Sequence, residues 1–217
     1  MLSLITARCT IESISPMCQS RHHGEPELEG ESPDAYDLRT WKLRMHTKFP
    51  LSLNSPQKAG EPNAESNTVT IPAKALHEAL TEGAKYTKRQ IPGQGKATWT
   101  AKFASGIALL SDIEIGVDPD TVPNIAVHCH SNGVRGSGKR VIRRFPIIQN
   151  WKATFDVQIL DPIITKDIFM EMAEQAGMFI GVGQNRPQNR GVHGRFRVLS
   201  VAYEGAPQVD PRRVRAA

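Results

Sequence analysis

Three stretches of the chain alternate apolar and polar residues, which predicts half-buried β-strands. They lie at residues 3–13, 152–160 and 196–201, and the second is the most regular. Its apolar face is formed by Ala153, Phe155, Val157 and Ile159. Two apolar runs, residues 103–115 and 121–130, predict further strands. We therefore expect a sheet whose strands come from the beginning, the middle and the end of the chain.

Two other stretches have the spacing of amphipathic helices. In residues 73–84, leucine and alanine recur at every fourth position, and Pro72 suits the first position of a helix. The N-terminus of this helix leaves free N–H groups, which predicts an anion site. In the second stretch, Thr165 can cap a helix whose apolar face extends to Ala176, and Gly177 is predicted to end it.

The order of these elements, once two insertions are removed, is β-α-β-β-α-β. This order predicts an α+β fold, a ferredoxin-like or RRM-like palm in which an antiparallel sheet packs against two helices. The longer insertion follows the first strand at about residues 17–67 and includes a short predicted helix at residues 36–46. The second, at about residues 130–146, is basic and glycine-rich and predicts a protruding hairpin. With 217 residues, of which 39% are hydrophobic, residues 1–217 are expected to form a single domain.

The loop at residues 181–194, between the second helix and the last strand, is the densest cluster of candidate functional groups. Glycine lets backbone N–H groups come close to a ligand and arginine offers a planar cationic fork, so the combination suits a phosphate chain. The alternative is a surface loop whose glycines only serve turns. The loop contains Gly181, Gly183, Gly191 and Gly194 together with Gln184, Arg186, Asn189 and Arg190, and Arg195 follows directly.

Charge and aromatic content narrow the choice of partner. The net charge of +5 and the pI near 9.2 allow a polyanionic partner without requiring one. Six acidic residues lie between Glu25 and Asp37, whereas basic residues gather at residues 85–102, 135–144 and 212–215. Aromatic residues make up only 6% of the chain, so a large platform for stacking bases is not expected.

Neither disulfides nor a membrane segment are expected. The chain has three scattered cysteines, which cannot form a disulfide framework and favour a reduced, cytoplasmic setting. No apolar run reaches the length of a transmembrane helix, and the first residues do not resemble a signal peptide, so no membrane contact is expected.

Few residues offer catalytic or metal-binding chemistry. His22 and His23, next to Arg21, are the best candidates for acid–base chemistry, although paired histidines in a polar turn can also simply contact RNA. His128 and His130 would share one face of a strand, but no further ligand pair lies at a usual zinc spacing. No P-loop or nucleophile elbow occurs. We therefore expect no catalytic residue, no metal and no cofactor.

Three features give the chain a resemblance to the RAMP superfamily of CRISPR RNA-binding proteins. The opening strand runs into Ile14-Ser15-Pro16. The segment Val69-Thr70-Ile71-Pro72 leads into a helix and looks like the Ile-Pro-Gly-Ser-Ser-Leu-Lys-Gly segment of the superfamily, with Ala73-Lys74-Ala75-Leu76 in place of the small polar residues. The loop at residues 181–194 is placed as the glycine-rich loop of the superfamily is placed. The resemblance covers most of the chain by order of elements, but only two short motifs by residue.

Within the superfamily the chain is most similar to the backbone subunit of CRISPR effector complexes, which has a palm, inserted fingers and a basic thumb. The resemblance implies a non-catalytic subunit that coats guide RNA, with copies of itself and other effector-complex subunits as further partners. Residues 131–144 would be the thumb, and the longer insertion would be the fingers. The chain is short for such a subunit, so a reduced or phage-borne relative is an alternative.

The residues expected to bind RNA are cations, histidines and amides from four parts of the chain. They are Arg21, His22, His23, Lys74, Lys85, Lys88, Arg89, Lys96, Arg135, Lys139, Arg140, Arg143, Arg144, Gln184, Arg186, Asn189, Arg190 and Arg195. Contacts of this kind depend on the phosphate backbone, so binding is expected to be sensitive to salt and mostly independent of base sequence. Single-stranded DNA would satisfy the same contacts.

Two other functions fit the same fold. The first is a metal-independent, guide-RNA-processing endoribonuclease, because a member of the superfamily uses a histidine to cleave RNA; His22 or His23 would take that role here. The second is a phage protein that acts through protein contacts alone, for example as an inhibitor of CRISPR immunity.

Overall fold

The largest element of the computed structural model, which describes residues 5–53, 66–130 and 140–205, is a four-stranded antiparallel sheet. Its strands lie in the order β4-β8-β1-β9, so the first strand of the chain lies between the last two. Helices α2 (Ala73–Thr87) and α4 (Lys166–Gln175) connect them. This is the β-α-β-β-α-β arrangement of a ferredoxin-like palm, which confirms the predicted fold class. The strands are β1 (Ile5–Ser13), β4 (Ile107–Ala108), β8 (Lys152–Ile159) and β9 (Phe196–Glu204).

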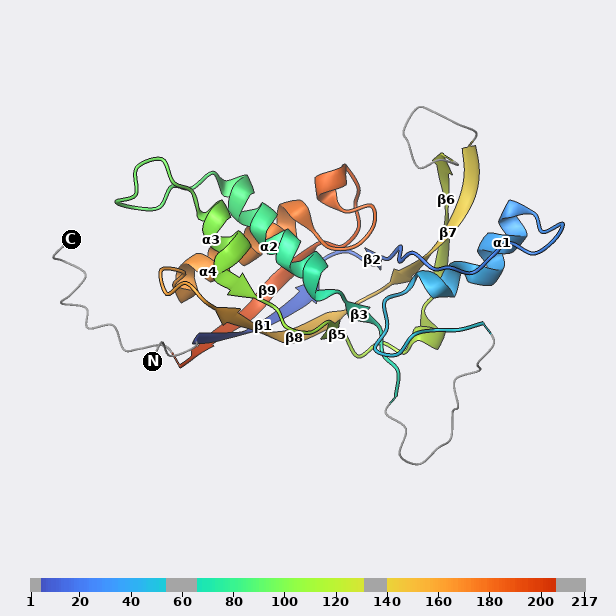
Figure 1. Ribbon diagram of the computed structural model, residues 1–217, viewed down its shortest axis with the longest axis horizontal. Coiled ribbons are helices and arrows are strands. Elements are labelled where there is room, and N and C mark those ends of the chain that lie inside the picture. The colour runs from blue at the N-terminus through green and yellow to red at the C-terminus, as the bar shows by residue number, and fades with distance from the viewer. Residues whose placement is uncertain (1–4, 54–65, 131–139, 206–217) are drawn as a thin grey trace.

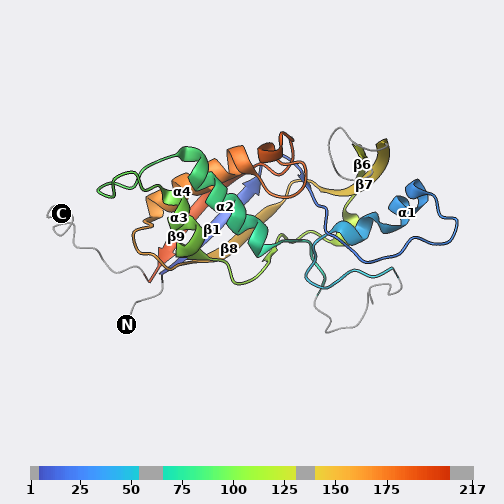
Figure 2. The same ribbon diagram turned by 45° about the horizontal axis from the view of Figure 1, so that its top comes forward.

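Three helices, α2, α4 and α3 (Trp99–Gly106), cover one face of this sheet (Figures 1 and 2). The alternation read in the sequence explains why, since every second side chain of β1 and β8 is buried beneath them. Aromatic and leucine side chains from the helices fill the space above the sheet, and Phe103 stacks on Phe169 with ring centroids 6.2 Å apart. Burial of this continuous core is what holds the palm together.

The opposite face of the sheet is polar and its arginines are already paired. Arg8 forms an ion pair with Asp156 on the neighbouring strand at 2.9 Å. Arg197 pairs with Glu12 in the same way at 2.6 Å. The side chains that β1 and β8 place on this face include no aromatic ring. This face therefore lacks the stacking residues that an RNA-recognition sheet uses.

Helix α4 begins as predicted but ends later. The Thr165 hydroxyl accepts a hydrogen bond from the N–H of Ile168 at 3.4 Å, so Thr165 is the N-cap. Gly177 does not end the helix, because the chain continues through the π-helical turn η3 (Ala176–Ile180) and stops at Gly181, whose φ is 72°. A Cβ on Gly177 would lie 2.2 Å from the Phe196 carbonyl oxygen, so this glycine allows close packing against β9 instead.

A second antiparallel sheet, β2-β7-β6, lies at one end of the palm and carries a protruding hairpin (Figure 1). Its strands are β2 (Met17–Cys18), β6 (Asn124–His130) and β7 (Arg140–Ile148). The hairpin corresponds to the predicted thumb-like segment, of which residues 131–139 lie outside the described residues. From the longer insertion, α1 (Pro33–Thr40) and the 3-10 helix η1 (Trp41–Arg44) pack against β7.

Two stretches differ from the prediction. Residues 103–115 do not form one buried strand: they begin inside α3 and continue as the short strands β4 and β5 (Ile113–Glu114). The helical spacing of Trp99, Phe103 and Gly106 is masked in the sequence by the apolar run that follows. The short insertion helix starts earlier than expected, at Pro33, because the Ser32 hydroxyl accepts the Ala35 N–H at 3.3 Å.

The remaining elements are short. Strand β3 (Thr70–Ile71) pairs with β5, and it leads into α2 as the sequence predicted. The 3-10 helices η2 (Pro119–Thr121) and η4 (Pro187–Asn189) lie before β6 and inside the glycine-rich loop. Among the described residues, no helix combines the length and the apolar character needed to cross a bilayer.

Candidate nucleic-acid interface

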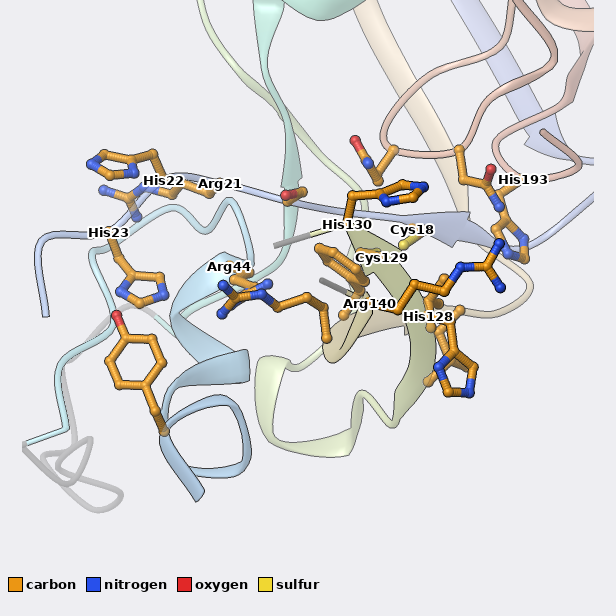
Figure 3. A pocket seen from close by; sticks show the side chains of 18 of the residues that line it. Cys18, Arg21, His22, His23, Arg44, His128, Cys129, His130, Arg140 and His193 are labelled. Carbon is orange, nitrogen blue, oxygen red and sulfur yellow. The ribbon is translucent and has the colours of Figure 1, made fainter. Parts of the chain in front are cut away.

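A pocket of about 840 Å³ lies where the palm, the insertion and the hairpin meet (Figure 3). Four parts of the chain form its walls: the chain from β2 to residue 27, the helices α1 and η1, strands β6 and β7, and the glycine-rich loop. Its polar lining consists of Ser20, Arg21, His22, His23, Glu27, Tyr36, Arg44, His128, His130, Arg140, Arg143, Gln184, Asn185 and His193. Cations and rings that can carry a positive charge therefore dominate the pocket.

Backbone hydrogen bonds hold the glycine-rich loop against one wall of this pocket. The Gln184 N–H donates to the Cys18 carbonyl at 2.6 Å, and the Gly194 N–H donates to the Pro16 carbonyl at 2.8 Å. At the base of the loop, the Val182 N–H donates to the Gly194 carbonyl at 3.0 Å. The two ends of the loop are thus bonded to each other, and its bonds to β2 and the residue before it hold the loop at the edge of the pocket.

The glycines of this loop serve those close backbone contacts. Gly183 and Gly194 have φ values of 81° and 76°, which suit glycine. A Cβ would lie 2.3 Å from the Cys18 carbonyl oxygen at Gly183, and 1.8 Å from the Val182 carbonyl oxygen at Gly194. The loop therefore offers a ligand its side chains, such as Gln184, Asn185 and His193, more than the exposed backbone that the sequence suggested.

Five of the seven histidines in the chain line the pocket. The Nδ1 atoms of His23 and His193 are buried and have no hydrogen-bond partner among the residues that the structure describes. Burial lowers the pKa of both rings, and the neighbouring Arg44 lowers that of His23 further. Both rings are therefore neutral near pH 7 and would gain a proton if an anion came close.

The four arginines of the pocket fall into two groups. Arg21 and Arg140 have no side-chain partner among the described residues. Arg44 and Arg143 instead share the carboxylate of Asp37, each at 2.9 Å. Arg21 and Arg140 are thus the cations most available to a ligand.

Asp37 joins the insertion to the hairpin. Its carboxylate is fully buried, and besides the two arginines it accepts the Arg144 backbone N–H at 2.7 Å. Arg144 itself reaches Asp34 and Asn124, each at 3.5 Å. A buried carboxylate is tolerated only with such partners, so this cluster fixes α1 on β7.

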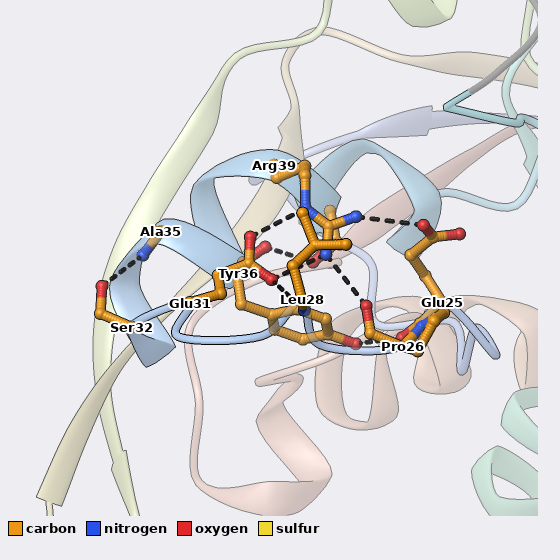
Figure 4. Close-up of polar contacts among 9 residues, drawn as sticks. Glu25, Pro26, Leu28, Glu31, Ser32, Ala35, Tyr36 and Arg39 are labelled. Atoms are coloured by element: carbon orange, nitrogen blue, oxygen red, sulfur yellow. Dashed lines mark hydrogen bonds and ion pairs between the residues drawn. The ribbon is translucent and has the colours of Figure 1, made fainter.

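The acidic segment before α1 is held in place by ion pairs and hydrogen bonds to Arg39 (Figure 4). The guanidinium of Arg39 contacts Glu31 at 2.8 Å and Glu25 at 3.1 Å, and it donates to the Pro26 carbonyl at 3.0 Å. Hydrogen bonds from Arg39 and from the Leu28 N–H lower the pKa of Glu31 to about 2. The positive charge of Arg39 thereby balances the negative charge of these carboxylates beside the pocket, so they do not repel an anionic ligand.

One side of the pocket is apolar. Cys18, Phe145 and Ile147 form a small buried cluster, against which Ile125, Val127 and Cys129 pack. Burial, with a smaller contribution from Cys129 nearby, raises the pKa of the Cys18 thiol to about 12, so this sulfur is a packing group. Among the described residues, no three histidine, cysteine or acidic side chains are arranged to hold a metal ion.

The predicted RNA-binding residues are only partly brought together. Arg21, His22, His23, Arg140, Arg143 and Gln184 line the pocket. Arg186, Asn189, Arg190 and Arg195 lie on or beside the glycine-rich loop, and Arg135 and Lys139 lie outside the described residues. Lys74, Lys85, Lys88, Arg89 and Lys96 lie on α2 or the loop after it. For all of these residues, RNA contact stays a prediction.

Cations on α2 and just after it already have acidic partners. Lys85 pairs with Glu82 at 3.1 Å, and Arg89 pairs with Glu171 on α4. The predicted anion site at the N-terminus of α2 is likewise used by the chain, since the Ala73 N–H donates to the Asp112 carboxylate at 2.9 Å. A phosphate at this helix end would have to displace Asp112.

Sequence reasoning missed several pocket residues. His193 was passed over because it stands among glycines and amides, and His128 and His130 were weighed only as metal ligands. One signal was present in the sequence: histidines occur next to Arg21, in the strand before Arg140 and in the glycine-rich loop. Only the register of β2, β7 and β6 shows that these segments meet.

The chain was also compared with known proteins. No family model matches it, and no curated protein does. Solved structures that resemble it include Cmr6 from Pyrococcus furiosus, at 12% identity and a TM-score of 0.47, with 91% of this chain and 99% of that chain covered. A chain of the Type III-B Cmr-beta complex bound to cognate target RNA follows at 11% identity and a TM-score of 0.44, with 95% and 62% covered.

A third structure is a chain of a CRISPR RNA-guided surveillance complex, at 6% identity and a TM-score of 0.37, with 90% of this chain and 68% of that chain covered. Likenesses at these identities and TM-scores carry no weight for function. The palm fold itself is shown by the strand order of the sheet. Structural neighbours of the chain thus include Cmr6, a chain of a Type III-B Cmr-beta complex and a chain of a CRISPR RNA-guided surveillance complex.

Proposed function

We propose that the chain is a non-catalytic RNA-binding subunit of a CRISPR effector-type ribonucleoprotein. One observation carries the proposal: a pocket at the junction of palm, insertion and hairpin gathers four arginines and five histidines, and Arg21 and Arg140 lack partners in the described part of the chain. The described residues that line it include one acid, Glu27. Such a surface attracts a polyanion.

A single RNA strand fits this surface better than a duplex does. The cations lie in a hollow between a hairpin and a loop, where a flexible backbone can enter. Arginine and histidine would hold the phosphates, and the amides of Gln184 and Asn185 can bind sugar hydroxyls or base edges. Ile125 and Val127, which are partly buried and line the pocket, would give bases an apolar surface to pack on.

The partners follow from the same proposal. In a guide ribonucleoprotein the strand would continue past this chain, so further copies of the chain or other effector subunits would bind the neighbouring nucleotides. The described part of the hairpin protrudes and has only a small apolar cluster at its base. A second subunit or the RNA itself would cover it.

Salt dependence tests the phosphate contacts. For a single strand, each phosphate contact contributes about 0.7 to the slope of log K against log salt. We expect Arg21→Gln and Arg140→Gln together to lower this slope by about 1.4, measured by fluorescence anisotropy with single-stranded RNA. Arg8→Gln is the matched control, because Arg8 lies on the open sheet face and pairs with Asp156. An affinity that ignores salt, or equal slopes in all variants, would overturn the proposal.

The histidines favour a second candidate, a metal-independent endoribonuclease. General acid–base cleavage of RNA needs one ring that takes the 2′-hydroxyl proton and another group that protonates the leaving oxygen. His22, His23 and His193 line one pocket, and within the described ranges the Nδ1 atoms of His23 and His193 have no hydrogen-bond partner. Incubation with structured repeat RNA in EDTA decides: defined cleavage that is lost in His23→Gln supports the enzyme, and intact RNA rejects it.

A further inference from the structure

Two aromatic side chains are stacked on each other at the surface of the palm. Tyr86, from the last turn of α2, and Phe179, from the π-helical turn η3, have ring centroids 4.7 Å apart and planes 16° apart. Tyr86 is 52% exposed and Phe179 is 42% exposed. In the described part of the chain, Phe49 is the one further aromatic residue with an exposed fraction above 40%. Two of the three most exposed aromatic side chains are therefore stacked on each other.

The π-helical turn is what leaves the Phe179 ring exposed beside Tyr86. Along α4 and into the turn, Met172, Ala176 and Ile180 stay buried, but the wider turn leaves Met178 and Phe179 outside, each more than 40% exposed. Turns of this kind are rare and are often found at functional sites. The helix α2 lies close by, because a Cβ on Gly83 would be 2.8 Å from the Cβ of Ala176.

Cationic residues lie next to the pair. Arg195 donates from its Nε to the carbonyl of Met178, the residue before Phe179, at 3.1 Å and has no carboxylate partner among the described residues. Lys88 follows Tyr86 by two residues as the C-cap of α2, and it also has no acidic partner in the described ranges. Aromatic rings close to cationic groups suit a strand whose bases alternate with phosphates.

The patch is joined to the pocket by the glycine-rich loop. Phe179 lies five residues before Gln184, so their Cα atoms are at most about 18 Å apart. The Gln188 side chain donates to Glu82, one turn before Tyr86 on α2, at 3.1 Å, which fixes the loop beside the pair. A strand that leaves the pocket can therefore cross the loop and reach the rings.

We propose that Tyr86 and Phe179 form a stacking platform for an unpaired base of the same RNA strand, and this inference rests on the proposed function. A protein partner is a weaker fit, since a stable protein interface needs about 20–30 residues a side. The exposed apolar patch here consists of Met178, Phe179 and Tyr86. A single base has about the area of one aromatic ring.

The test compares two oligouridylates, one of about 16 nucleotides and one of about 4, which bracket the site sizes of single-strand binding domains. Stacking contributes about 1–3 kcal/mol per base, so Tyr86→Leu and Phe179→Leu are expected to weaken binding of the longer RNA about fivefold to a hundredfold. Tyr86→Phe keeps the ring and should bind as the wild type does. The short RNA, which fills only the pocket, should bind all variants alike.

An abasic strand of the longer length completes the comparison. It should bind the wild type more weakly than the oligouridylate does, and this difference should shrink in Tyr86→Leu. If the leucine variants bind the long RNA normally while Arg21→Gln with Arg140→Gln loses affinity, the platform is refuted and the proposed function stands. If they lose self-association in sedimentation and not RNA affinity, the patch binds protein and the inference is wrong. If the wild type binds neither RNA, the proposed function fails first.

Discussion

Lowering the pH from about 7.5 to about 5.5 is expected to strengthen RNA binding, because the pocket contains neutral histidines. In the free protein, burial lowers the pKa of His23 and His193, and Arg44 adds to the effect at His23. A bound phosphate favours the protonated ring, so both pKa values rise in the complex. The resulting gain in affinity is complete below the pKa of the free ring and is lost as the pH rises through the pKa of the bound ring.

The magnitude follows from proton linkage. Each proton taken up on binding changes the association constant by up to about tenfold per pH unit, so two rings give at most about a hundredfold per unit. Arginine stays charged throughout this range and adds nothing to the slope. A terminal phosphate would titrate near pH 6, so the RNA probe should lack one.

The assay is fluorescence anisotropy with an internally labelled oligouridylate at constant ionic strength. His23→Gln with His193→Gln should flatten the pH profile, whereas His77→Gln, on α2 outside the pocket, should leave it unchanged. Folding responds in the opposite direction: rings with a lowered pKa make the free protein less stable as the pH falls, which thermal unfolding checks. A wild-type profile that is flat, or that the double variant shares, would refute the reasoning.

Two further predictions concern stability. Asp37→Asn removes the buried charge shared by Arg44 and Arg143, so we expect the free energy of unfolding in urea to fall by about 3 kcal/mol. The control is Asp34→Asn: the Asp34 side chain is 61% exposed, so its loss should cost no more than about 1 kcal/mol. Equal unfolding midpoints for the two variants would contradict the role of Asp37. Gly194→Ala adds a Cβ 1.8 Å from the Val182 carbonyl oxygen at a φ of 76°, so it should lower the free energy of unfolding by about 1–3 kcal/mol or more. Gly24→Ala is the control, because its added Cβ meets nothing within 4 Å. An unchanged melting temperature for Gly194→Ala would show that the loop adjusts freely.

The sequence was most informative where one face of an element is buried. The alternation in residues 3–13 and 152–160 predicted β1 and β8, and Thr165 marked the start of α4, because each signal is local. Residues 99–106 were misassigned since an apolar run without clear periodicity follows the helix. Gly177 was misread as a helix end because its close contact with Phe196 depends on β9.

The candidate site could be predicted only in part. Arg21, His22 and His23 stood out by their chemistry, as did the glycine-rich loop. Periodicity reports that a side chain is buried but not which segment lies against it. The pocket depends on the pairing of Cys18 with Ile147 and on the hydrogen bond from Gln184 to Cys18. These contacts join parts of the chain more than 120 residues apart, so local pattern could not show that His193 would face Arg21 across the pocket.

The shared carboxylate of Asp37 has a consequence for how such a chain can diverge. One of its arginines, Arg44, belongs to the longer insertion, and the other, Arg143, belongs to the hairpin. Deleting the insertion would leave Arg143 on the hairpin without its carboxylate, whereas deleting the hairpin would leave Asp37 still paired with Arg44. The hairpin therefore depends on the insertion, and a chimera that borrows the hairpin from a relative must borrow α1 with it.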